Sequence, residues 1–377
     1  MEEPIPFWFI SLCLGLFGAC VGSFLNVAIY RIPRGISVNK PARSFCPNCK
    51  TPIPWYNNLP MISWLLLRGK SACCSQHISF RYWGVEALTA LLFTIASYWA
   101  FISFPDFPIH VAILLCLWIA FAVTIAFIDA EQMIVHLSQT IWASLIGMGI
   151  VCLYPEILLD LPTYTWESAL LYSAIGGAVG FASIKVIIEL GKLAFGTWKA
   201  HYESPTRWEL VEPQTEEEEM ELHLGEESHP WSMLFHRTTD KATFFEGTIS
   251  IDKKKPIPFQ SLELHETKIY IPQTRQEWLI EDITSASGTL LRAEAKREAM
   301  GAGDAWIMMM IGCLFGWQAV IFSLAAASFI GIGFAVINKI GIGKPLPFGP
   351  CLLLGAASWF FGGYLLWEWY FNYFNNF

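Results

Sequence analysis

The sequence predicts an all-α polytopic membrane protein with about eight transmembrane helices, a cytoplasmic cysteine-containing loop and a cytoplasmic β-rich insert. The chain of 377 residues is 54% hydrophobic and only 15% charged, and its mean hydropathy is +0.44. These values are typical of a multispanning membrane protein and argue against a soluble protein of equal length. We expect the lipid bilayer as its environment and no nucleic acid as a partner.

Eight apolar stretches are predicted to cross the roughly 30 Å of hydrocarbon in a bilayer. They run from about 7 to 29, 83 to 104, 109 to 128, 139 to 158, 166 to 190, 305 to 318, 319 to 338 and 351 to 370. The sixth and seventh are separated only weakly, around Gly316-Trp317-Gln318. The first lacks a basic start and a small-residue cleavage site, so we expect a retained helix rather than a removed signal.

The distribution of basic residues predicts the orientation. If Met1 lies outside the cytoplasm, the loops 31–82, 129–138, 191–303 and 339–350 lie inside, and they hold every Lys and Arg except Lys185. Lys and Arg bias a loop toward the cytoplasm. We therefore expect this orientation and not the inverse one.

The same threading divides the chain into five parts. They are a first helix (1–30), a cysteine-containing loop (31–82), helices over 83–198, an insert (199–296) and helices over 297–377. Short alternating apolar runs in the insert, such as Thr248–Ile251 and Lys268–Ile271, predict β-strands there.

Two aspartates stand at the cytoplasmic ends of apolar stretches. Asp129 closes one of them, and Asp304 stands in Met300-Gly-Ala-Gly-Asp304. Ionisable groups are costly in such surroundings and usually mark function. Gly301 and Gly303 lack a Cβ, so another backbone can approach Asp304 closely. A pair that meets across a helix bundle predicts acid–base chemistry on a membrane substrate.

Peptide hydrolysis needs a base to activate water and an acid to protonate the carbonyl oxygen, and two close carboxylates sharing one proton supply both. A helix carboxyl end disfavours negative charge and an amino end favours it. We therefore expect Asp304 to be the ionised partner and Asp129 the proton holder. Two other classes stay open, a proton-coupled transporter that uses both carboxylates as a relay and a catalytically silent scaffold.

Four cysteines gather in the polar loop, in Cys46-Pro-Asn-Cys49 and Cys73-Cys74. A reducing compartment argues against disulfides, and Cys-x-x-Cys suits tetrahedral zinc. The preferred ligand set is Cys46, Cys49, Cys74 and His77, with Cys73 as an alternative ligand. Free structural thiols are the other interpretation.

Several segments together resemble the bacterial type IV prepilin peptidases, which are membrane aspartic proteases of the Gly-x-Gly-Asp type. They follow the order of that family and touch most of the chain outside the insert. They are Gly22–Pro33, Cys46–Cys49, Asn58–Gly69, Ile78–Glu86, Phe127–Asp129, Ala299–Asp304 and Pro345–Pro350.

The resemblance implies an enzyme of the bacterial inner membrane that faces the cytoplasm. It would remove the leader peptide from type IV prepilins or type II secretion pseudopilins. Many members also methylate the new amino terminus with S-adenosylmethionine. Carried over, Asp129 and Asp304 are the catalytic pair, Gly301 and Gly303 shape the second aspartate's turn, and the zinc ligands fall on Cys46, Cys49, Ser71 and Cys74.

This chain departs from the family at four places, one of which is Trp306, where a Lys is usual two residues beyond the second aspartate. Ser71 stands where a third thiol is usual, so Cys73 or His77 replaces it or the metal is lost. His136 stands where a Pro is common, and the insert before Gly301 is not part of the common pattern. The sequence contains no nucleotide-binding loop, so S-adenosylmethionine enters only through the resemblance.

Overall fold

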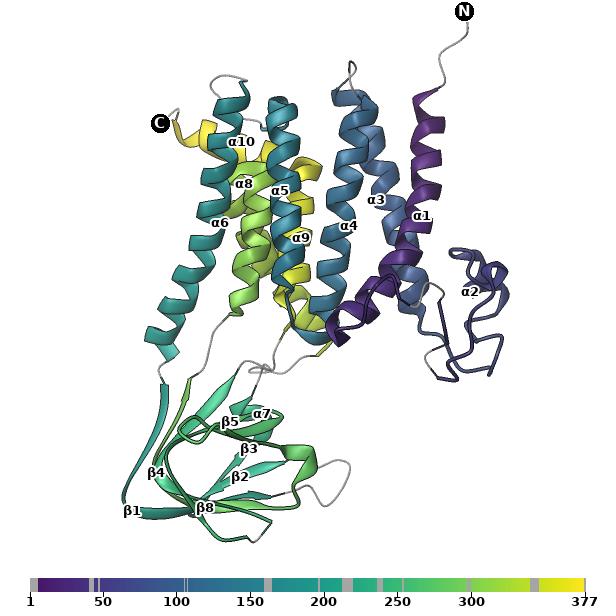
Figure 1. The fold of residues 1–377 in the computed structure, drawn as a ribbon. Coiled ribbons are helices and arrows are strands. Elements are labelled where there is room, and N and C mark those ends of the chain that lie inside the picture. Colours follow the sequence, from purple (N-terminus) through teal and green to yellow (C-terminus); the bar gives the residue numbers. More distant parts are fainter. Residues whose placement is uncertain are drawn as a thin grey trace, which may run out of the picture. The chain divides into compact units, whose positions relative to one another are not determined.

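The computed structural model describes residues 6–375 except 41–43, 47, 105, 107, 159–164, 196, 212–219, 236–239, 253, 297–299 and 340–345. The chain divides into two compact units, one holding 1–184, 302–334 and 347–377 and the other 185–301 and 335–346. We call the first the helical unit, and we call residues 197–296 of the second the β insert. Each is drawn in Figure 1.

The helical unit consists of long apolar helices. They are α1 (Phe7–Arg31), α3 (Phe80–Ser103), α4 (Pro108–Gln132), α5 (Leu137–Leu153), α6 (Trp166–Phe195), α8 (Ala302–Ile337), α9 (Phe348–Ser358) and α10 (Tyr364–Asn375). A π-helical turn, Trp359–Gly363, joins the last two. Apolar side chains point outward, for example Leu16 at 64% and Trp142 at 59% exposure. Such a surface suits lipid, because hydrocarbon does not penalise exposed apolar groups.

Six helical stretches are long and apolar enough to span a membrane: α1, α3, α4, α6, α8 and the run from α9 into α10. The protein is therefore a polytopic membrane protein, as the sequence predicts. The apolar helix α5 is shorter, with 17 residues. The predicted total of eight spans and the cytoplasmic side of the loops stay predictions.

Helix α8 is interrupted at Gly316, whose φ of 82° and ψ of 178° lie outside the helical region. This break falls where the sequence separates its sixth and seventh stretches. Ile307 lies against Gly349, and Ser323 lies against Gly355. A straight helix would place Ile307 about 24 Å from Ser323. Their contact partners in α9, Gly349 and Gly355, are only about 9 Å apart along the helix. The chain therefore turns back at Gly316.

Helices α1 and α3 pack closely along a row of glycines. A Cβ added to Gly22 would lie 2.7 Å from the Glu86 Cα atom, and one added to Gly18 would lie 2.9 Å from the Phe93 side chain. Larger residues would push the helices apart. One turn beyond Gly22, the Asn26 amide nitrogen donates to the Tyr82 carbonyl at 2.9 Å.

The cysteine-containing loop joins α1 to α3 and has little regular structure. It contains the 3₁₀ turns Ile32–Arg34 and Trp55–Asn57 and the short helix α2 (Ile62–Leu66). Isolated bridges join Phe45 to Pro52 and Lys70 to His77. These two bridges close the turns that carry the cysteines. A further 3₁₀ turn, Pro155–Ile157, follows α5.

The β insert is an antiparallel sheet of eight strands in the order β3-β2-β1-β8-β4-β5-β6-β7. The strands are β1 (Thr197–Val211), β2 (Glu221–Leu224), β3 (Glu227–Pro230), β4 (Lys241–Ile251), β5 (Ile257–His265), β6 (Lys268–Ile271), β7 (Gln276–Leu279) and β8 (Ala286–Lys296). A helical turn, α7 (Trp231–Leu234), follows β3, and the 3₁₀ turn Ile280–Asp282 follows β7.

Alternation of buried and partly exposed residues explains why these segments form strands. In β6 the pattern over Lys268–Ile271 is strictly alternating, and β4 includes the predicted run Thr248–Ile251. The apolar residues of alternate positions form one core around Trp208, Phe244 and Leu262, all fully buried. The β-rich character predicted for the insert is confirmed.

Candidate active site

Asp129 lies in the last turn of α4 and is only 4% exposed. Its Oδ2 atom accepts a hydrogen bond of 2.9 Å from the backbone N–H of Gly349, in the first turn of α9. A helix amino terminus carries free N–H groups and a partial positive charge, so it stabilises a carboxylate. The Asp129 side chain therefore links α4, which carries it, to the amino terminus of α9.

Gly349 has no room for a side chain. An added Cβ would lie 2.6 Å from Asp129 Oδ2 and 2.8 Å from Ile307 Cδ1. Real Cβ atoms essentially never approach other atoms so closely, so any larger residue must displace the carboxylate or α9. Glycine at this position lets the α9 amide reach Asp129.

Asp304 lies in the first turn of α8 and is 5% exposed. The preceding Gly303 packs on the connection between α4 and α5, where an added Cβ would lie 2.7 Å from the Val135 Cβ. This packing leaves no room for a side chain at position 303. The roles predicted for Gly301 and Gly303, to let another backbone approach Asp304 and to shape its turn, stay predictions.

The two aspartates belong to converging elements. Ile307, one turn after Asp304, lies against the same Gly349 that binds Asp129. Both carboxylates also act electrostatically on the Cys351 thiol of α9. The last turn of α4 and the first turns of α8 and α9 thus gather two buried carboxylates around one point. The catalytic partnership of the two aspartates stays a prediction.

The α9 amide changes the electrostatic argument for the pair. The sequence assigns a favourable helix amino end to Asp304 alone, whereas Asp129 also receives one, from Gly349. The order in which the two aspartates ionise stays a prediction. The family resemblance includes the segment Pro345–Pro350 but gives it no role. A glycine between two prolines before an apolar run is the sequence signal that points to the Gly349 amide.

The four loop thiols form one cluster. The Sγ atoms of Cys46, Cys49, Cys73 and Cys74 all lie within 4.8 Å of one another. The pairs Cys46–Cys74, Cys49–Cys73 and Cys73–Cys74 are separated by 3.7, 3.3 and 4.0 Å. Zn–S bonds of about 2.3 Å in a tetrahedron place the sulfurs about 3.8 Å apart. The donor set therefore fits a zinc ion.

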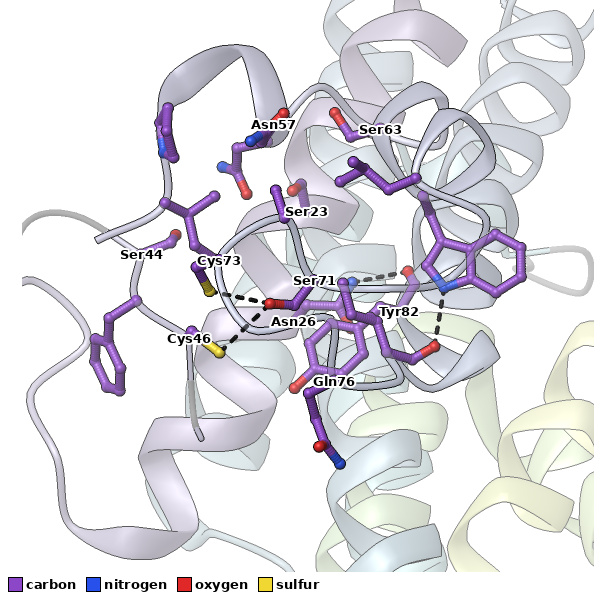
Figure 2. Close-up of a pocket in the computed structure, with 18 of the residues that line it drawn as sticks. Ser23, Asn26, Ser44, Cys46, Asn57, Ser63, Ser71, Cys73, Gln76 and Tyr82 are labelled. Carbon is purple, nitrogen blue, oxygen red and sulfur yellow. Dashed lines mark hydrogen bonds between the residues drawn. The ribbon is translucent and has the colours of Figure 1, made fainter. Parts of the chain in front are cut away.

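Cys73, rather than His77, completes this cluster in the described part of the chain. His77 instead forms the bridge to Lys70. The Ser71 hydroxyl lies among the sulfurs, 3.0 Å from Cys73, 3.3 Å from Cys74 and 3.9 Å from Cys46. Figure 2 shows Ser71 between Cys46 and Cys73. Ser71 thus occupies the place of a ligand but offers a hydroxyl.

Hydrogen bonds prepare one of these thiols for binding a metal. Bonds from the Ser71 hydroxyl, the Gln76 backbone and the Asn48 amide lower the pKa of the Cys74 thiol to about 6. The thiolate is the form that binds metals. Cys74 therefore supplies a thiolate near neutral pH.

The other residues noted in the sequence lie apart from these clusters or beside them. His136 precedes α5, and its Nε2 atom is buried without a hydrogen-bond partner. It follows Val135, which contacts Gly303. The segment Ala299–Asp304 begins at a residue outside the described part of the chain.

Comparison with known families gives two matches. Residues 16–101 match the bacterial peptidase A24 N-terminal domain, and residues 276–336 match the type IV leader peptidase family. The first covers α1 from residue 16, the cysteine cluster and α3 up to residue 101, and the second covers Asp304. Asp129 lies in neither match. No solved structure matches the chain.

Curated relatives are each named prepilin leader peptidase/N-methyltransferase. The protein of Klebsiella pneumoniae is 32% identical over 203 residues, covering 50% of this chain and 85% of the relative. The protein of Myxococcus xanthus is 37% identical over 200 residues, covering 52% of this chain and 53% of the relative. The protein of Aeromonas hydrophila is 25% identical over 402 residues, covering 98% of this chain and 96% of the relative.

Proposed function

The chain belongs to the type IV leader peptidase family, and on that premise we propose that it is a prepilin leader peptidase and N-methyltransferase. It cleaves the leader from type IV prepilins or type II secretion pseudopilins and methylates the amino terminus that cleavage exposes. The observation that carries the peptidase is the convergence of buried Asp129 and Asp304 at the amino terminus of α9.

The chemistry follows from two carboxyl groups that hold one proton between them. The ionised carboxylate takes a proton from water, and the resulting hydroxide attacks the scissile carbonyl carbon. The protonated carboxyl donates to the carbonyl oxygen. The C–N bond then breaks as the carboxyl that took the proton from water passes it to the leaving nitrogen, and the other carboxylate takes back a hydroxyl proton from the tetrahedral intermediate. The Gly349 N–H holds Asp129 in place through this exchange.

The place of the pair suits the substrate. Asp129 ends an apolar helix and Asp304 begins one, so both stand at a boundary of the membrane and not at its centre. A prepilin joins a basic leader to an apolar helix, and the bond between them lies at the same level. We place this boundary on the cytoplasmic side of the bacterial inner membrane, because all Lys and Arg except Lys185 then lie in cytoplasmic loops.

Cleavage of a candidate prepilin by the purified protein in detergent tests the peptidase. Asp129→Asn and Asp304→Asn should each lower the rate about 10²- to 10⁴-fold, the usual contribution of a general acid or base. Glu131→Gln is the matched control, because Glu131 is in the same helix turn and forms an ion pair with Arg81. Full cleavage by both Asn variants would exclude this mechanism.

We also propose that Cys46, Cys49, Cys73 and Cys74 bind a structural zinc ion, with the Ser71 hydroxyl donating its one hydrogen to a neighbouring thiolate. When bound, the metal would tie the two turns of the loop together. Zinc content measured in the purified protein should fall for Cys46→Ser and stay near one ion per chain for His77→Ala and Cys20→Ser. If His77→Ala lost zinc and Cys73→Ser kept it, the ligands would be Cys46, Cys49, Cys74 and His77, the set preferred from the sequence, and this proposal would be wrong.

A further inference from the structure

Two buried polar atoms without partners lie where helix α5 begins. His136 immediately precedes the helix, and its Nε2 atom is buried with no hydrogen-bond partner in the described chain. Gln139, three residues further, is 9% exposed, and its Oε1 atom also lacks a partner there. Buried polar atoms are nearly always paired, so two such atoms in one helical turn point to a ligand.

The start of α5 does not need these two atoms. The His136 carbonyl accepts hydrogen bonds from the backbone N–H groups of Gln139 at 3.1 Å and Thr140 at 3.4 Å. The His136 side chain makes no capping hydrogen bond. Residues three apart in a helix lie on the same face, so the imidazole and the amide are neighbours. The backbone alone therefore begins the helix, and capping does not explain either side chain.

Two contacts fix how α5 lies along α8. An added Cβ on Gly303 would lie 2.7 Å from the Val135 Cβ, and one on Gly147 would lie 3.3 Å from the Leu314 Cβ. From Val135 to Gly147 and from Gly303 to Leu314 the chain advances by almost the same number of residues. The two helices therefore run parallel and in step.

This register places both orphan atoms beside the aspartate pair. His136 is level with Asp304, and Gln139, which belongs to the buried face of α5, is level with Ile307. Ile307 packs against the glycine that binds Asp129. The first turn of α5 is thus a fourth element next to the point where α4, α8 and α9 converge.

Burial of these residues matches that of the aspartates. Gln139 is 9% exposed, and Asp129 and Asp304 are 4% and 5% exposed. A substrate must reach the two carboxylates before its peptide bond can be cut. A peptide that reaches them also lies within the surroundings of the first turn of α5.

The chemistry of the two atoms indicates which part of a peptide they bind. An amide Oε1 only accepts hydrogen bonds, whereas the imidazole Nε2 donates in one tautomer. In an extended chain, the N–H and C=O groups of one residue point to the same side. One acceptor and one donor on neighbouring side chains complement such a residue.

We propose that His136 and Gln139 bind the backbone of the prepilin next to the scissile bond. His136 Nε2–H donates to a substrate carbonyl, and Gln139 Oε1 accepts from a substrate N–H. The proposal rests on the peptidase half of the proposed function. It makes the two residues positioning residues, which hold the peptide against the aspartates and take no part in proton transfer. His136 stands where the family commonly has Pro, which has no side-chain donor, so this contact is particular to the present chain.

A purely structural role is the competing interpretation. In that case the two side chains stabilise the α4–α5 connection, and their replacement lowers the melting temperature without changing substrate binding. The proposal predicts the reverse. A buried polar atom without a partner costs stability in the unbound protein, so an apolar replacement should keep or raise the melting temperature while it weakens substrate binding.

Leader cleavage by the full-length protein in detergent, measured over a range of prepilin concentrations, tests the proposal. His136→Phe and Gln139→Leu should each raise KM about three- to tenfold, the usual effect of one lost hydrogen bond. Their kcat should stay within about twofold of the parent, since the lost bond is made equally in the ground state and the transition state.

Ser138→Ala is the matched control for both variants. Ser138 lies between the two residues and is exposed, so its loss should change neither KM nor kcat. Parental KM values for His136→Phe and Gln139→Leu would overturn the proposal, whether or not their melting temperatures fall. A rise in KM with an unchanged or higher melting temperature supports it.

Ester substitution in the substrate gives a test that does not depend on how a variant folds. Each backbone N–H near the scissile bond is replaced in turn by an ester oxygen, and the scissile bond itself is kept as an amide. The parent should show a raised KM at one position. At that position Gln139→Leu should show no further rise, because the bond is already missing. No sensitive position, or losses that simply add, would overturn the assignment.

The outcomes separate this proposal from the proposed function. If the parent cleaves prepilin while both variants keep the parental KM, the roles given to His136 and Gln139 are wrong and the peptidase stands. If the parent cleaves no prepilin, the peptidase and this proposal both fail.

Discussion

The helical unit and the β insert bury different kinds of side chain. The interior of the helical unit contains Asn26, Glu86, Asp129 and Asp304, each less than one-tenth exposed. In the described part of the insert, Asp240 is the one buried polar side chain, and the rest of the core is apolar. Burying a charge is costly, and burying apolar surface is favourable. The interior of the helical unit is therefore less stable than a purely apolar interior would be.

This difference teaches where to look for chemistry. The charges of the insert lie on its surface in pairs such as Lys241–Glu263 and Lys268–Glu277. Such pairs contribute little to stability and need no functional explanation. The buried carboxylates of the helical unit need one, and in the described chain these are Asp129, Asp304 and Glu86.

Removal of Phe244 should give the largest effect on the insert. Phe244 is fully buried in β4, and its ring centroid lies 5.2 Å from that of Trp208. Phe244→Ala should destabilise the insert by about 3 to 5 kcal/mol, because it leaves a cavity in an apolar core. Hydrogen exchange of the β4 and β8 amides in the full-length protein measures this loss.

The neighbouring residue provides the control for that comparison. Phe245 is partly exposed, and the Arg292 guanidinium lies 4.2 Å from its ring centroid. Phe245→Ala should therefore cost much less. Leader cleavage by Phe244→Ala should stay near that of the parent, since both aspartates belong to the helical unit. If Phe244→Ala lowered leader cleavage as well as the stability of the insert, the assignment of catalysis to the helical unit alone would be wrong.

Enlargement of Gly349 should give the next largest effect, this time on chemistry. A methyl group there would lie 2.6 Å from Asp129 Oδ2, so Gly349→Ala should displace the carboxylate and lower the cleavage rate about a hundredfold. Gly149→Ala is the control, because nothing lies within 4 Å of an added Cβ on that residue of α5. Equal rates for the two variants would contradict the role given to the α9 amide.

Local patterns predicted much of this structure. Apolar length predicted the long helices, the weak point at Gly316 predicted the break in α8, and alternation predicted the strands at Thr248 and Lys268. These features depend on neighbouring residues in the chain. The sequence also predicted a cysteine cluster in the loop, since a Cys-x-x-Cys turn brings its own thiols together.

Long-range contacts account for what the sequence did not predict. The Gly349 N–H and Asp129 are 220 residues apart, and no local pattern around either residue predicts that they form a hydrogen bond. The same holds for Met61 and Glu86, which are 25 residues apart and meet through a strained turn. Ser71 and Cys73 compete for one place in the thiol cluster, and only the path of the loop selects the thiol.

The smallest expected effect comes from an exposed pair, and its sign can be worked out. Partial burial opposes ionisation of Glu263, but the hydrogen bond and charge of Lys241, followed by those of His265, lower its pKa below the ordinary 4.5. A carboxyl with a lowered pKa stabilises the folded state above its unfolded pKa, and this stability is lost as the pH falls through the folded value.

Glu263→Gln should therefore destabilise the insert by about 0.2 to 1 kcal/mol at pH 7, and by less at high salt. The difference from the parent should shrink as the pH is lowered toward 3, where the parent carboxyl is also protonated. Hydrogen exchange of β4 and β5 at several pH values, after correction for the intrinsic rates, measures it. A difference that stays constant down to pH 3 would mean that Glu263 contributes through packing and not through its charge. The charged surface of the insert would then need a specific explanation, as the buried carboxylates of the helical unit do.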